Sequence, residues 1–62
     1  LAALVEAAVH ASRIPVFERS DPRRAQELRL RVKELLSLAE RLGPTDRIRA
    51  ICGAIRRKYG IG

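Results

Sequence analysis

The chain has 62 residues and a formal net charge of +6, from thirteen basic and seven acidic residues. A chain of this length forms one domain at most, with a small core. A single cysteine excludes an internal disulfide, and one histidine leaves no Cys/His set for a structural zinc. Because the first residue is Leu1 rather than Met, we expect a fragment of a longer protein.

The first predicted helix covers about residues 1–14. One helical face is predicted from the spacing of Leu1, Leu4, Val5, Ala8 and Ala11. Pro15 disfavours helical geometry at the residue before it, so we expect the helix to end there. The apolar opening is too short to span a membrane and lacks the flanks of a signal peptide.

Glu6 and His10 lie four residues apart in this helix. A carboxylate beside an imidazole could be half of a metal site, but no third ligand is near, so we expect a local surface pair. In the connection that follows, residues 15–20, we expect Val16 and Phe17 to fold over one end of the bundle.

The second predicted helix, residues 22–42, has the clearest boundaries. Ser20 or Asp21 can cap its start, Pro22 suits the first helical position, and Gly43 suits a left-handed residue at its end. One apolar stripe is predicted, made of Ala25, Leu28, Val32, Leu35, Leu36, Ala39 and Leu42.

The third predicted helix covers residues 46–59, with Thr45 as its N-cap. Its expected core stripe is Ile48, Ile51, Cys52, Ile55 and Tyr59. We interpret Cys52 as a small buried hydrophobic residue, because a reactive thiolate needs exposure and a neighbouring base. Three amphipathic helices joined by short connections predict an all-α fold, a small antiparallel three-helix bundle forming a single domain over residues 1–62.

The other face of the third helix carries a concentration of cations around small residues. The small residues are Ala50, Gly53 and Ala54, and the cations are Arg47, Arg49, Arg56, Arg57 and Lys58. Arg23 and Arg24 begin the second helix, where the helix dipole disfavours cations. Eleven of the thirteen basic residues are Arg, which the coding bias of a source genome would also produce.

No nucleotide-binding, metal or catalytic motif occurs in the sequence, which predicts a non-catalytic protein without a cofactor or metal. The basic charge predicts an intracellular module that binds nucleic acid mainly through phosphates, using Arg47, Arg49, Arg56, Arg57 and Lys58 with Arg23 and Arg24. A duplex of DNA or RNA is favoured over a single strand, because no aromatic platform is available for stacking bases. The location would be the cytoplasm, nucleoid or nucleus.

The alternative is a protein-interaction or self-association module that docks an acidic or helical partner, or a second copy in a homodimer. Its contact residues would be Val9, Leu30, Leu38, Ala50, Gly53 and Ala54. Association of the third helix with an anionic membrane surface is a further alternative, although bulky aromatic anchors are missing.

Overall fold

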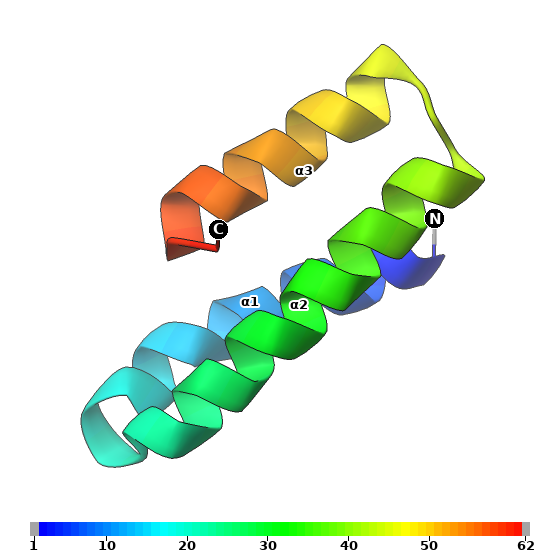
Figure 1. The fold of residues 1–62 in the computed structure, drawn as a ribbon. Coiled ribbons are helices and arrows are strands. Elements are labelled where there is room, and N and C mark those ends of the chain that lie inside the picture. Colours follow the sequence, from blue (N-terminus) through cyan, green and yellow to red (C-terminus); the bar gives the residue numbers. More distant parts are fainter. Residues whose placement is uncertain (1, 62) are drawn as a thin grey trace.

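The structure, a computed structural model, describes residues 2–61 and consists of three helices. They are α1 (Ala2–Ser20), α2 (Pro22–Leu42) and α3 (Asp46–Tyr59). α1 and α2 form an antiparallel hairpin, and α3 runs back along α2 in the opposite direction (Figure 1). The predicted all-α three-helix bundle is therefore confirmed. Within residues 2–61, no helix is both long and apolar enough to cross a membrane.

α1 extends six residues further than the sequence predicts, so the expected end at Ile14 is wrong. Pro15 lies inside the helix, where it removes one backbone hydrogen bond. The extension brings Phe17 against the core as a half-buried side chain, while Val16 stays exposed. The Asp21 amide then donates to the Phe17 carbonyl at 2.7 Å, and the turn into α2 is a single residue. Core packing by Phe17 outweighs the local effect of the proline.

The buried face of α1 also differs from the predicted stripe. Its buried residues are Ala3, Leu4, Ala7, Ala11 and Ile14. Val5 and Ala8 are exposed, and Leu1 lies outside the described residues. α1 has more apolar residues than one face can hold, so spacing alone does not select the face. The small side chains of Ala3, Ala7 and Ala11 let α1 approach α2 closely, and Ile14 fills the space that remains.

α2 has the predicted bounds and nearly the predicted core. Asp21 caps its start by accepting from the Arg24 amide at 3.3 Å, while Leu42, at the other end of the stripe, is 72% exposed. Gly43 ends α2 with φ −136°, so it is not left-handed as expected. A Cβ on Gly43 would lie 3.3 Å from Ile48 Cδ1, so this glycine allows the chain to turn close beside α3.

Thr45 caps the start of α3, and its hydroxyl accepts from the Ile48 amide at 3.2 Å. Only Cys52 is buried in this helix, with Ile48, Ile55 and Tyr59 packed against the core as half-buried side chains. Ile51 is 40% exposed and is not part of the core, because it lies on the flank of α3 beyond the reach of the hairpin. α3 therefore packs on the hairpin by a narrow stripe.

The chain after α3 adds a core residue that the sequence did not predict. Gly60 is left-handed, with φ 66°, and the Ile61 amide donates to the Arg56 carbonyl at 2.9 Å. This helix ending turns Ile61 back onto the bundle, where it is buried. The hydrophobic contact after a left-handed glycine thus fastens the end of α3 to α2.

Candidate nucleic-acid interface

The face of α3 turned away from the hairpin carries two neighbouring rows of residues, at about 100° per residue. One row is Arg49, Gly53 and Arg57, and the other is Arg47, Ala50, Ala54 and Lys58. The four cations are exposed, as are Ala50 and Ala54. Within the described residues none of these four cations has an ion-pair partner, and the Lys58 ammonium lies 5.5 Å from the Tyr59 ring centre. We call Arg47, Arg49, Arg57 and Lys58 the α3 cation set.

Asp46 is exposed at the amino end of the same face. It lies in the first turn of α3, where a carboxylate complements the positive end of the helix dipole. The cations of the last turn, Arg57 and Lys58, complement the opposite end. The face is therefore acidic only at its first residue and basic along the rest.

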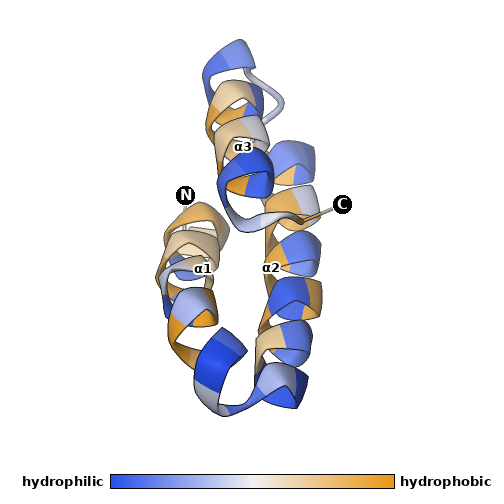
Figure 2. Ribbon diagram, turned by 90° about the vertical axis from the view of Figure 1, so that its left-hand side faces the viewer, coloured by the Kyte–Doolittle hydropathy of each residue, from blue (hydrophilic) through white to orange (hydrophobic). Residues whose placement is uncertain are grey.

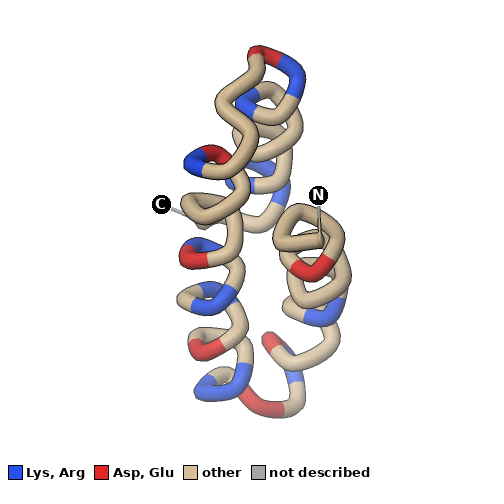
Figure 3. The backbone as a smooth tube through the Cα atoms, turned by 90° about the vertical axis from the view of Figure 1, so that its right-hand side faces the viewer, with Lys and Arg blue, Asp and Glu red and all other residues tan. Residues whose placement is uncertain are grey.

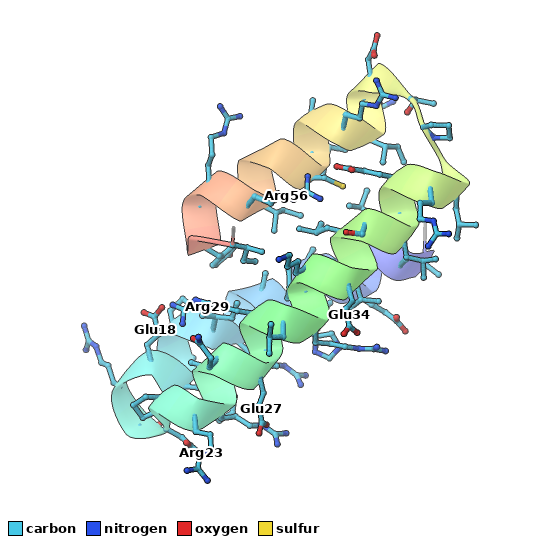
Figure 4. The ribbon with its side chains drawn as sticks, in the orientation of Figure 1. Glu18, Arg23, Glu27, Arg29, Glu34 and Arg56 are labelled. Carbon is cyan, nitrogen blue, oxygen red and sulfur yellow. The ribbon has the colours of Figure 1, made fainter. Side chains whose placement is uncertain are left out.

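Arg56 is separated from the α3 cation set by an ion pair. Its Nη1 donates to Glu40 Oε1 at 2.7 Å, and both side chains are about one-third exposed. Figure 4 shows Arg56 lying between α3 and α2 rather than on the outer face. This pair fastens α3 to α2, so Arg56 has a structural partner that the sequence did not reveal.

Arg23 and Arg24 lie at the other end of the molecule from the start of α3. Figure 4 shows Arg23 beside the α1–α2 turn, well away from Arg56. The Arg24 guanidinium lies 6.0 Å from the centre of the Phe17 ring, a cation–π contact that covers the end of the core. The two residues therefore do not join the α3 cation set in one patch.

Two of the six cations on α2 have carboxylate partners among the described residues. Arg29 pairs with Glu18 across the α1–α2 interface, and Arg31 lies 3.6 Å from Glu34 one turn along. Acidic and basic segments alternate along α2 (Figure 3). The other four, Arg23, Arg24, Lys33 and Arg41, are exposed without an ion-pair partner among residues 2–61, but they are spread along and around α2, with Glu27 and Glu34 between them.

The Cys52 thiol has no features of a nucleophile. It is buried, and its Sγ donates to the Leu36 carbonyl at 3.8 Å, a weak contact that brings α3 onto α2. Burial raises the pKa of the Cys52 thiol, the Glu40 carboxylate raises it further, and the Arg56 guanidinium opposes both. The thiol therefore stays protonated at neutral pH, as a buried hydrophobic residue would.

His10 does not form the expected surface pair with Glu6. Its side chain is half-buried, and its Nδ1 atom is buried without a hydrogen-bond partner, whereas Glu6 is exposed. Across residues 2–61, no three His, Cys, Asp or Glu side chains come together as a group that could hold a metal ion. His10 therefore lies partly buried on α1, rather than on its surface beside Glu6.

The residues of the alternative protein-contact site are dispersed, and all are exposed except Gly53, which is half-buried. Val9 lies on α1, Leu30 and Leu38 on α2, and the small residues on α3. Leu30 lines a shallow hollow together with Gln26, Arg29, Lys33, Gly60 and Ile61. The structure adds exposed apolar side chains that the sequence analysis did not propose as a contact site: Val5, Val16, Leu42 and Ile51.

Comparison with family models finds a match for this chain. The chain belongs to the family described as protein of unknown function DUF447, whose C-terminal model (DUF447_C) matches residues 1–53. The match spans α1, α2 and α3 as far as Gly53, so Arg57 and Lys58 of the DUF447 chain lie beyond it. A search of curated proteins found no match, and a search of solved structures found none either.

Proposed function

We propose that this DUF447 domain is a non-catalytic, intracellular module that binds duplex nucleic acid through phosphate contacts on the outer face of α3. The observation that carries the proposal is the α3 cation set: four exposed cations without carboxylate partners among the described residues, ranged around small side chains. Arg can bond phosphate in bidentate fashion, and small residues between cations let a backbone approach.

The dimensions of the face suit a duplex backbone. Arg47 and Lys58 are eleven residues apart, which corresponds to about 16 Å along a helix. A duplex carries one phosphate per strand for about every 3.4 Å of its axis, so several phosphates fall within this length. Arg47 and Lys58 lie on one flank of this face and Arg49 on the other, with Arg57 between them, so α3 lying in a groove could engage phosphates of both strands. Arg23, Arg24 and Arg56 are directed elsewhere.

The expected contacts carry little sequence information. Phosphate contacts fix position without reading sequence, and Asn and Gln, the side chains that commonly pair with adenine, are absent from this face. The two aromatic side chains, Phe17 and Tyr59, are half-buried against the core, so neither offers an open ring for stacking single-stranded bases. We therefore expect similar affinity for duplexes of unrelated sequence.

The test is fluorescence anisotropy with a labelled duplex across a series of salt concentrations. Four phosphate contacts predict a slope of about −3.6 for log K against log salt, and Arg49→Ala/Arg57→Ala should reduce it to about −1.8. Arg19→Ala/Arg41→Ala removes the same charge from exposed sites on α1 and α2 and should leave the slope near the wild-type value. Absence of binding at low salt, or equal slopes for the two double variants, would reject the proposal.

A second candidate, docking of an acidic or helical protein partner on the same face, is favoured by Gly53. A glycine inside a helix costs about 1 kcal/mol relative to Ala. Nothing lies within 4 Å of the position that a Cβ on Gly53 would take, so no close contact within the chain requires it. A close-packed partner helix would supply such a contact. Binding of an acidic helical peptide that is lost in Gly53→Leu, together with no binding of a duplex at low salt, would favour this second candidate.

A further inference from the structure

The outer face of α1 is apolar, although it is the face opposite the core. Val5, Val9 and Val16 are 61%, 45% and 66% exposed, and they lie about half a turn away from the buried Ala7 and Ile14. Figure 2 shows apolar colour over most of the amino-terminal half of α1, in contrast to the mixed colouring of α2. A helix that is apolar on both sides is typical of one that is covered on both sides.

The exposed valines belong to a continuous seam. Val5, Val9, Ser12 and Val16 follow one another at spacings of four, three and four residues, which is the heptad pattern of a helix pair. Ser12 does not interrupt the seam, because its hydroxyl donates to the Val9 carbonyl at 2.7 Å and so has a partner already. We call these four residues the α1 valine seam.

The two edges of the α1 valine seam differ. Glu6 and Arg13 lie along one edge, both exposed, and Ala8 and Pro15 lie along the other. Glu6 and Arg13 are seven residues apart, or about 10 Å along the helix axis, so they cannot pair with each other. Neither has an ion-pair partner among residues 2–61.

We infer that the α1 valine seam binds the same seam of a second copy of this chain, with the two α1 helices antiparallel. An antiparallel pair brings identical edges together, so Glu6 lies near the partner's Arg13 and Arg13 near the partner's Glu6. A parallel pair would instead place the charged edge against the partner's Ala8 and Pro15. Charge complementarity between Glu6 and Arg13 therefore favours a second copy of this chain as the partner, with its α1 antiparallel.

One antiparallel register pairs both the seam residues and the charged edges of the two copies. When Val5 lies beside the partner's Val16, Val9 lies beside the partner's Ser12, and the charged edges fall within reach of each other. The contact involves one helix from each copy and is small, so we expect a weak dimer in rapid exchange. It uses the side of α1 opposite the hairpin core and leaves the outer face of α3 free, so it is independent of nucleic-acid binding.

The test is sedimentation equilibrium of the 62-residue chain at concentrations up to about 1 mM, a range suited to weak contacts. Wild type should dimerise. Glu6→Arg and Arg13→Glu should each weaken the dimer at least tenfold, because like charges then face each other twice. The double variant Glu6→Arg/Arg13→Glu should restore it, and an equal mixture of the two single variants should form a heterodimer.

Arg41→Glu is the control, since it makes the same change of charge as Arg13→Glu at an exposed site on α2, outside the α1 valine seam. Circular dichroism should be unchanged in every variant, because the substituted side chains are exposed. A chain that is monomeric throughout would overturn the inference and assign the face to another domain or protein. Single variants that dimerise like wild type, or a double variant that does not recover, would overturn it equally.

Discussion

The α1–α2 hairpin and α3 are held in the structure by different amounts of packing. The hairpin contributes ten of the buried core residues, whereas α3 contributes Cys52 and the segment after it contributes Ile61. α3 is attached by the half-buried side chains of Ile48, Ile55 and Tyr59 and by three individual contacts: the Arg56–Glu40 pair, the Cys52 thiol and buried Ile61. An element with little buried apolar area opens more readily than the rest of a fold. The molecule thus combines a hydrophobic hairpin with a more lightly attached basic helix.

The largest expected effect comes from the core beneath both regions. Leu36 is fully buried, and its carbonyl accepts from the Cys52 thiol, so Leu36→Ala should lower the free energy of unfolding by about 2–5 kcal/mol. Leu42→Ala, at the exposed end of the same helix, should change it by less than about 0.5 kcal/mol. Urea unfolding followed by circular dichroism measures both. Equal losses would mean that the hairpin core is not the main source of stability.

Loss of the Arg56–Glu40 pair should loosen α3 selectively. Both partners are partly exposed, so Glu40→Gln should cost no more than about 1 kcal/mol. Amide hydrogen exchange should accelerate in residues 46–59 and remain slow in the middle of α2. Arg31→Gln, which removes a more exposed partner of Glu34, is the matched control and should leave α3 unchanged. Uniform acceleration in all three helices would show instead that α3 does not open separately.

Gly53→Ala should stabilise α3, which is the opposite of the effect expected for Glu40→Gln. The added Cβ meets no atom within 4 Å, and alanine favours a helix over glycine by about 1 kcal/mol. The variant should therefore be more stable than wild type by up to that amount, with slower exchange in α3. Gly60→Ala, at a left-handed residue, should be destabilising and provides the contrast. A destabilised Gly53→Ala would reveal a contact that requires the glycine.

The smallest expected effect is the pH dependence of the contact between α3 and α2. The Cys52 pKa is raised in the folded protein, so the folded state holds the thiol proton more tightly than the unfolded state does. This contribution is complete below about pH 8.5, the ordinary cysteine value, and is lost as pH rises through the folded pKa. Wild type should therefore lose more stability than Cys52→Ala between about pH 8 and pH 10. Parallel losses would assign the change to other groups.

The two later helices show how far the sequence alone determines this protein. Asp21, Pro22, Thr45 and the glycines after each helix act within one turn of the backbone, so the bounds of α2 and α3 follow from local chemistry. The α2 stripe also follows from the sequence, because its remaining faces are charged. These elements, with three helices and short connections, are sufficient to predict the all-α bundle.

The tertiary structure decided what local signals leave open. α1 is apolar on several sides, so only contact with α2 determines that Ile14 is buried and Val5 exposed. Packing of Phe17 carries α1 past Pro15, a gain that no local rule includes. The Arg56–Glu40 pair joins residues sixteen positions apart, and Ile61 reaches the core only because Gly60 turns the chain back. Such contacts depend on the arrangement of the helices in space. The same arrangement pairs Arg56 with Glu40 and so separates Arg56 from the α3 cation set.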